Sequence, residues 1–449
     1  MLLTEREAKA LTDEILGYVS ADDAEVSVES VDYSHLRFAA NGFRTSGRQE
    51  DTTAKVTVWI QKKKGSASTN ETDSASLRAL VEQAERFARL SPVDPQYLPT
   101  LGPQRYRPVQ GFVEATVNVS PPLRARALAD VIASCEKEDI AGAGFHQAVG
   151  KASASATRHG NFYWNRSSLV SLSVTARTVE GGGSGYFLRN HFDVSKLDVA
   201  RVSHESIQKA LRSRQPRTLS AGAYTVILEP QAVADLLSYF PFEFDAREAD
   251  EGRSPFSAPG GKTKVGQKVF DERLNLYSDP WHPDLPGSPA AREGIPAQNL
   301  YLVKHGVLET LTYSRFWADQ EHKEPTPGPV NVILQSTAPP ASLEEMIQGT
   351  RAGLLVSRFW YIRPVDPRTA ALTGLTRDGV WYIENGMVQY PVRNFRFNQS
   401  ILEMLAPGNV DLIGASERVG SSEAQGWNAA MFPALKLKKF HFTSQSEAV

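Results

Sequence analysis

The run KVTVWI at residues 55–60 alternates apolar with polar side chains, which is typical of a β-strand that buries one face. A shorter alternation at Val26 and Val28 precedes it, and Asn41-Gly42 lies between the two runs. Asn-Gly favours a tight hairpin turn because both residues tolerate a left-handed backbone. Residues 26–60 therefore predict a β-hairpin that begins a sheet.

Four stretches around this hairpin have the apolar periodicity of α-helices. They are residues 4–19, residues 73–90, the stretch that follows Pro121-Pro122, and residues 198–212. The first begins with Thr4 and Glu7, which match a capping box, and the third has Cys135 on its apolar face. Because an amphipathic helix buries its apolar face, we expect the helices to cover the sheet, with Cys135 in the core and Phe87 of the second helix pointing inward.

The chain changes character at residues 214–221, where prolines and glycines replace the helical pattern. A length of 449 residues exceeds the ~250 to 300 residues at which single cores stop growing, so two domains are expected, at residues 1–217 and 222–449. After the break, residues 224–228 predict a strand, Pro230 starts a short helix, and turn-rich, β-branched sequence follows. The predicted fold class is α+β, with an N-terminal mixed sheet and helices and a C-terminal, mainly antiparallel β domain that is barrel-like or sandwich-like.

The composition argues against several classes of function. Lys and Arg number 49 against 51 Asp and Glu, so no broad positive field is available to hold nucleic acid. Cys135 is the single cysteine, which excludes an internal disulfide or a multi-cysteine metal site and fits a reducing compartment. The sequence opens on charged residues and holds no apolar run near the ~18 residues of a membrane span. We expect a soluble, cytoplasmic protein whose partners include no nucleic acid and no membrane.

Three local patterns suggest chemistry but have simpler interpretations. The glycine run at residues 181–185 lacks the Lys-Ser/Thr ending of a P-loop, so we interpret it as a hairpin tip or loop. His204 begins a His-Glu pair without the second histidine of a zinc protease, and residues 204–209 are expected to form a solvated helix face. The basic runs at residues 62–64 and 436–439 flank predicted strands, where charges keep strand edges from pairing.

Several longer motifs follow one another in a recognisable order. They are AANG at 39–42, SAST at 66–69, PVDP at 92–95, VILEP at 226–230, GRS at 252–254, EGIP at 293–296, HGVL at 305–308, WYIENG at 381–386 and YPVRN at 390–394. In order and spacing they resemble the TldD/PmbA family, also called the modulator of DNA gyrase family, over nearly the whole chain. Residues 290–292 and 357–364 depart from the PmbA pattern.

This family divides by its zinc chemistry. TldD-like chains carry His-Glu-x-x-x-His on the helix after the first strand of the second domain and a cysteine near the C-terminus, whereas PmbA-like chains, also called TldE, lack these residues. The equivalent helix here reads EPQAVADLLSYF at residues 229–240, and the resemblance places Ser238 and Glu243 near the two histidines and Tyr239 near the glutamate. Residues 414–439 contain no cysteine. The resemblance therefore implies a PmbA-like member with no catalytic residue and no metal ligand of its own.

The resemblance also implies a partner. Without zinc to lower the pKa of water towards ~7, this chain has no hydroxide nucleophile for peptide hydrolysis. It is expected to be the non-catalytic subunit of a TldD/TldE-type metallopeptidase that acts on unfolded peptides, paired with a zinc-bearing TldD-like chain or with a second copy of itself. Extended peptides can be held by strand addition to a β-rich half. Two alternatives stay open: an active metallopeptidase with converging histidines, and a stand-alone homodimeric peptide-binding or regulatory protein.

Overall fold

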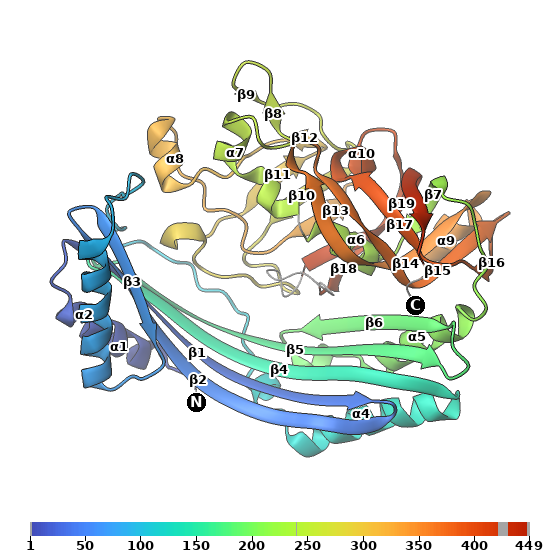
Figure 1. Cartoon of the computed structure of the whole chain (residues 1–449), viewed down its shortest axis with the longest axis horizontal. Helices are drawn as coiled ribbons and strands as arrows, with labels where there is room; N and C mark the ends of the chain where they lie inside the picture. The colour runs from blue at the N-terminus through green and yellow to red at the C-terminus, as the bar shows by residue number, and fades with distance from the viewer. Residues whose placement is uncertain (1, 239, 421–429, 447–449) are drawn as a thin grey trace.

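The computed structural model describes residues 2–238, 240–420 and 430–446, which build two sheets with helices around them (Figure 1). The strands of the N-terminal half, up to residue 221, are β1 (Asp23–Ala39), β2 (Gly42–Ile60), β3 (Lys63–Thr69), β4 (Ile140–Thr157), β5 (Phe162–Thr178) and β6 (Ser184–His191). Its helices are α1 (Glu5–Tyr18), α2 (Ser74–Leu90), α3 (Glu114–Val117), α4 (Pro121–Lys137) and α5 (Val199–Arg212), with a 3₁₀ turn η1 (Val194–Lys196).

The N-terminal strands form one sheet in the order β3-β2-β1-β4-β5-β6. A hairpin joins β1 to β2 as predicted, but its turn residues are Ala40 and Asn41, at φ of 47° and 55°, and not Asn41 and Gly42, since Gly42 pairs with Ala39 at the start of β2. Every pairing between the described strands of this sheet is antiparallel. The α+β class is confirmed, but the expectation of a mixed N-terminal sheet is wrong. Short turns make the consecutive strand pairs antiparallel, and the central pair β1 and β4, which is not consecutive, is antiparallel as well.

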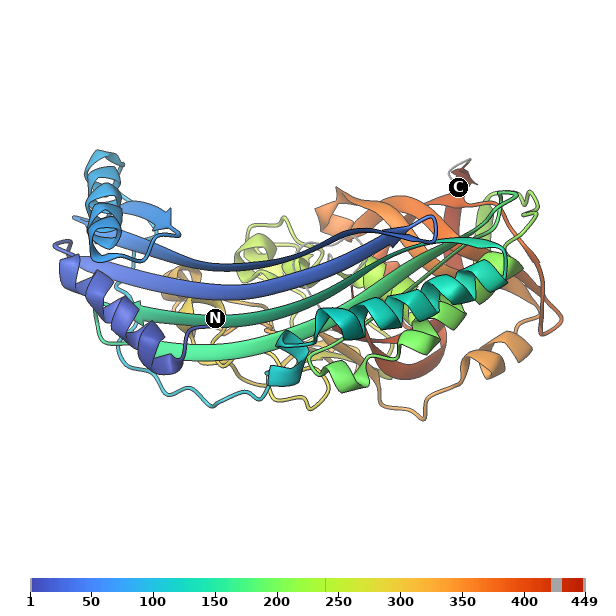
Figure 2. The same ribbon diagram turned by 90° about the horizontal axis from the view of Figure 1, so that it is seen from below.

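Helices cover one face of this long, curved sheet, and the C-terminal half lies over the other face (Figures 1 and 2). At one end, α1 and α2 enclose a core that contains Ile15 and Leu80. At the other end, α4 and α5 enclose a core that contains Phe38 and Leu128, and Cys135 is fully buried in it, as predicted. The face of the sheet that carries no helices therefore looks towards the C-terminal half.

Local capping signals predicted the helix starts correctly. Thr4 forms the capping box of α1, and Asp73 caps α2. The inward orientation expected of Phe87 is wrong, since this side chain is 39% exposed. A Cβ atom on Gly65 would lie 2.1 Å from the carbonyl oxygen of Ala84, so α2 packs directly on the backbone of β3 and Phe87 falls outside the contact.

The C-terminal half contains many short elements. Its strands are β7 (Gly222–Leu228), β8 (Ser257–Ala258), β9 (Lys262–Thr263), β10 (Leu274–Ser278), β11 (Leu300–Lys304), β12 (Val307–Leu308), β13 (Ile333–Ser336), β14 (Ala352–Asp366), β15 (Ala371–Glu384), β16 (Met387–Pro391), β17 (Phe395–Ser400), β18 (Val410–Val419) and β19 (Ala430–Gln445). Its helices are α6 (Pro230–Leu237), α7 (Ala246–Asp250), α8 (Arg315–Gln320), α9 (Leu343–Gln348) and α10 (Ile401–Leu405), with 3₁₀ turns η2 (Phe240–Phe244), η3 (Arg292–Gly294) and η4 (Pro367–Thr369). None of the helices in the described ranges is long and apolar enough to cross a membrane.

Five of these strands close into a barrel. The pairing order β19-β17-β15-β14-β7 returns to its start because β7 also pairs with β19. Phenylalanine rings fill the interior, with the centroid of Phe440 5.5 Å from that of Phe359 and 5.6 Å from that of Phe397. Most pairings are antiparallel, while β14 with β7 and β13 with β19 are parallel. The predicted barrel-like, mainly antiparallel C-terminal fold is confirmed.

The two basic runs have different environments. Residues 62–64 lie at the turn into β3, the outer strand of its sheet, which agrees with the expected role at a strand edge. Lys436 instead lies within β19 and is buried. Its Nζ atom donates to the Gly349 carbonyl oxygen at 2.8 Å and pairs with Asp411 at 3.0 Å. The edge interpretation is therefore wrong for Lys436, whose charge is satisfied inside the C-terminal half.

Candidate functional site

The helix α6 leads into the segment in which the resemblance places the zinc-binding residues, and it ends at Leu237, before those positions. It follows directly from the barrel strand β7, with Glu229 at its N-cap and Pro230 in its first turn. Proline is favoured there because the first N–H groups of a helix have no intrahelical partner. Residues 231–237 are all buried, since α6 packs against β14 and β19. The helix thereby holds Ser238, its C-cap, inside the C-terminal half.

The polar side chains at the end of α6 are already hydrogen bonded. Ser238 is buried, and its Oγ donates to the carbonyl oxygen of Asp235 at 2.9 Å. The Asp235 carboxylate accepts the side-chain amide of Gln231 at 2.9 Å and the backbone N–H of Phe359 at 3.0 Å. Tyr239 lies outside the described residues. Ser238 and Asp235 therefore tie α6 to itself and to β14.

Glu243, the other predicted position, lies in η2 beside a small cavity that Phe240, Pro367 and Ile401 line. Burial, and to a smaller extent the neighbouring carboxylate of Glu248, raises the pKa of Glu243 to about 7. This carboxyl group therefore changes charge near neutral pH. Neither the sequence pattern nor the resemblance predicts that property, because it depends on the packing around η2.

The described residues of this segment do not fit zinc. A tetrahedral site needs three or four His, Cys or carboxylate ligands that converge on one point. Within residues 2–238, 240–420 and 430–446, no group of three His, Cys, Asp or Glu side chains has such an arrangement. Ser238 donates within its own helix, and Asp235 accepts from two protein groups.

Replacing Glu243 with glutamine should remove a pH-dependent loss of stability. The pKa rises from 4.5 to about 7 on folding, so the folded state holds its proton while the unfolded state ionises. The wild type should lose stability relative to Glu243→Gln as the pH rises from about 4.5 through 7, by on the order of 1–2 kcal/mol after solvent screening is allowed for. Urea unfolding of both proteins at pH 5 and pH 8 gives their free energies of unfolding. If the difference between the two proteins is the same at both pH values, the prediction is wrong.

The solvated face expected at residues 204–209 is only half correct. His204 is exposed, but Lys209 is 6% exposed and lies at the boundary between the two halves of the chain. Its Nζ atom pairs with the carboxylate of Glu229 and donates to Ser357 Oγ at 2.8 Å. Ser357 Oγ also lies 3.3 Å from the Glu229 carboxylate. A helix of the N-terminal half is thus bonded to the start of α6.

This cluster has the atom types of a Ser–Lys dyad but not its environment. A lysine that acts as general base must be neutral to accept the proton of the serine, and both side chains must face a substrate cleft. A carboxylate next to the lysine keeps it protonated. Here the Lys209 ammonium is paired with Glu229, and Ser357 is only 1% exposed. We therefore interpret the cluster as a structural link.

Further polar contacts fix the two halves against each other. The glycine run begins in the turn of the β5–β6 hairpin, as predicted, with Gly181 and Gly182 at positive φ. Ser184, the first residue of β6, donates to the buried carboxylate of Asp378 in β15. The indole N–H of Trp381 donates to the carbonyl oxygen of Arg212 at 3.1 Å.

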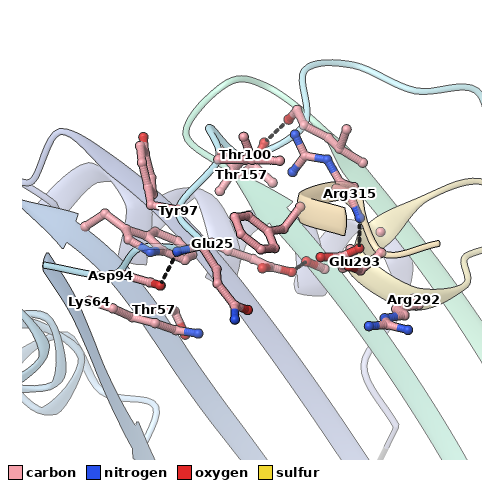
Figure 3. Close-up of a pocket in the computed structure, with 18 of the residues that line it drawn as sticks. Glu25, Thr57, Lys64, Asp94, Tyr97, Thr100, Thr157, Arg292, Glu293 and Arg315 are labelled. Carbon is pink, nitrogen blue, oxygen red and sulfur yellow. Dashed lines mark hydrogen bonds between the residues drawn. The ribbon is translucent and has the colours of Figure 1, made fainter. Parts of the chain in front are cut away.

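A cavity of about 540 Å³ lies between the C-terminal half and the face of the N-terminal sheet that carries no helices (Figure 3). Its labelled walls include Glu25 and Thr57 from the sheet, Tyr97 from the segment after α2, and Glu293 and Arg315 from the other half. The Arg315 backbone N–H donates to the Glu293 carboxylate at 2.8 Å. Sequence reasoning missed this cavity, because its residues come from segments far apart in the chain.

The fold matches that of several solved structures. TldE from Thermococcus kodakarensis superimposes with a TM-score of 0.85 at 18% identity, covering 97% of this chain and 99% of that one. A candidate modulator of a DNA gyrase from Thermotoga maritima gives a TM-score of 0.82 at 16% identity, covering 97% and 100%. A corresponding candidate from Bacteroides thetaiotaomicron gives 0.82 at 18% identity, covering 99% and 100%. The fold class is therefore that of the TldE and DNA gyrase modulator structures.

Sequence comparison gives the family. Residues 24–88 match the family model for PmbA/TldA metallopeptidase domain 1, and residues 221–444 match that for the PmbA/TldA metallopeptidase C-terminal domain. A protein named metalloprotease from Methanothermobacter thermautotrophicus is 25% identical over 257 residues, which are 54% of this chain and 52% of that relative. The match thus spans about half the length of this relative. The chain belongs to the TldD/PmbA metallopeptidase family.

Proposed function

We propose that this chain is the non-catalytic subunit of a TldD/TldE-type metallopeptidase complex that degrades or matures unfolded peptides. The observation that carries the proposal is the set of side chains at the end of α6. By the resemblance, Ser238 and Glu243 lie near the positions of two zinc-binding histidines. Zinc bound in a TldD-like partner would supply the activated water that peptide hydrolysis needs.

The features of this chain that support a role with peptides are its shape and its charges. The cavity between the halves combines the carboxylates of Glu25 and Glu293 with the cations of Lys64 and Arg315. Such a mixed lining suits a flexible polar chain better than a polyanion. The single cysteine, Cys135, fits a reducing cytoplasm, where we propose that the complex acts.

Reconstitution tests the proposal. The chain is purified alone and together with a TldD-like chain that has the His-Glu-x-x-x-His motif, and zinc content, native mass and cleavage of an unfolded peptide are measured. We expect sub-stoichiometric zinc and no cleavage for the chain alone, and a zinc-containing heterodimer with chelator-sensitive activity for the pair. Stoichiometric zinc or chelator-sensitive cleavage in the isolated chain would sink the proposal. A homodimer that does not bind the TldD-like chain would instead support a stand-alone peptide-binding protein.

A further inference from the structure

One edge of β5 has no partner strand between Phe162 and Arg166. β4 pairs with the opposite edge of β5 along this whole stretch, whereas β6 pairs only with the part that starts at Val170. The backbone N–H of Thr157 donates to the carbonyl oxygen of Asn161 at 3.0 Å. In an antiparallel ladder this register directs the odd-numbered residues of β5 towards β4 and the even-numbered residues away from it.

The backbone N–H groups of Phe162, Trp164 and Arg166 therefore point outward. Ser168 follows the same alternation, since its N–H donates to the Gly111 carbonyl oxygen at 2.9 Å. The N–H groups of Phe162, Trp164 and Arg166 make no hydrogen bond within the part of the chain that the structure describes. Such a row of unpaired groups is a template for another strand.

Residues 104–111, which we call the strap, run beside this edge without pairing along it. Its two ends touch β5 and the turn before it: Gln104 N–H donates to Asn161 Oδ1 at 3.1 Å, and Gly111 accepts from Ser168. Its middle is tied to the C-terminal half, because Trp281 Nε1 donates to the Pro108 carbonyl oxygen at 3.1 Å. Tyr106 likewise donates to the Gly294 carbonyl oxygen at 2.5 Å.

A slot of about 510 Å³ lies between the strap and the edge of β5. Its lining includes Tyr106, Val109, Phe112, Phe162, Trp164 and Arg166. The indole N–H of Trp164 is buried and has no hydrogen-bond partner. The slot thus offers apolar ring surface and free backbone donors two residues apart, which is the repeat of an extended chain.

We propose that this slot binds a short extended segment of a peptide by strand addition to residues 162–166 of β5. The proposal rests on the peptide-handling part of the proposed function and gives this chain a peptide site of its own, in the N-terminal half. The strap contacts the chain at both ends of the free edge, at Asn161 and Ser168, so the edge has length for a short extended peptide but not for the longer sheet edge of a second copy.

Two variants at one residue separate backbone from side-chain effects. Arg166→Pro removes an outward N–H and leaves the ladder to β4 intact, because proline is tolerated where the N–H faces away from the partner strand. Arg166→Ala keeps that N–H and is the matched control. Binding of a short fluorescein-labelled Thr/Val peptide to the full chain is measured by anisotropy. We expect Arg166→Pro to bind the peptide roughly 3- to 10-fold more weakly than Arg166→Ala, as for one lost hydrogen bond.

Equal affinity of the two variants, or no binding by the wild type, overturns the proposal. Should Arg166→Pro fail to fold, amide hydrogen exchange of the wild type decides: saturating peptide must slow exchange at Phe162, Trp164 and Arg166, and unchanged exchange there overturns the site. These measurements need neither zinc nor a partner. If peptide slows exchange at these residues but the chain does not associate with a TldD-like subunit, the proposed complex is wrong and the proposed peptide site still holds.

Discussion

Replacing Lys209 with alanine is expected to destabilise the protein by about 3–5 kcal/mol, because it leaves the carboxylate of Glu229 buried without its cation. Both side chains are shielded from water, and Ser357 adds a hydrogen bond to the Lys209 ammonium at 2.8 Å. The pair also joins α5 to the start of α6, so its loss weakens the contact between the two halves. Urea unfolding monitored by tryptophan fluorescence gives the free energy of unfolding.

Two further proteins make the Lys209 test specific. The double variant Lys209→Met with Glu229→Gln removes both charges, and should lose clearly less stability than Lys209→Ala since no charge stays buried alone. Lys9→Ala breaks an exposed ion pair with Asp13 and should change stability by less than about 1 kcal/mol. If Lys209→Ala lowers the free energy of unfolding no more than Lys9→Ala does, the pair of Lys209 and Glu229 does not stabilise the contact between the two halves.

Replacing Phe440 with alanine is expected to cost about 3–5 kcal/mol, because it empties part of the barrel interior. Phe440 is fully buried, and its ring centroid lies 5.1 Å from that of Phe442 and 5.5 Å from that of Phe359. The rigid barrel cannot collapse around the missing ring, so both the transfer and the cavity contributions are lost. Thermal and urea unfolding measure the effect.

An exposed phenylalanine provides the control for this cavity. Phe43, near the β1–β2 turn, is 47% exposed, and Phe43→Ala should change the free energy of unfolding by less than about 0.5 kcal/mol. Phe440→Leu should fall between the two, since leucine fills part of the space. Similar values for Phe440→Ala and Phe43→Ala would mean that the barrel interior is not packed as described.

Local signals explain which parts of the fold the sequence predicted. Thr4 and Asp73 cap helices through side chains only a few residues from the groups they bond, so a short window contains the whole interaction. Asn41 tolerates the left-handed backbone of its turn in the same local way. The buried position of Cys135 followed from helical spacing alone. These features need no knowledge of distant residues.

The errors at single side chains share one physical cause. Lys209 and Lys436 are charged residues that were expected on the surface, but both are buried, and each pairs with a carboxylate from another element, Glu229 or Asp411. Charge and helical position cannot reveal such a partner, since the pairing depends on how elements from different parts of the chain pack. Sequence periodicity also missed that α2 rests on Gly65, which turned Phe87 towards solvent.

The sequence by itself determined the family motifs, the absence of histidine from residues 205–281, and the amphipathic elements of an α+β protein. Only the tertiary structure decided the closed barrel, the pKa of Glu243, the cavity beside Glu25 and the free edge at Trp164. Capping, turns and strand alternation act over a few residues, whereas barrel closure, burial of a carboxyl group and an unpaired strand edge depend on segments that meet only after the chain has folded.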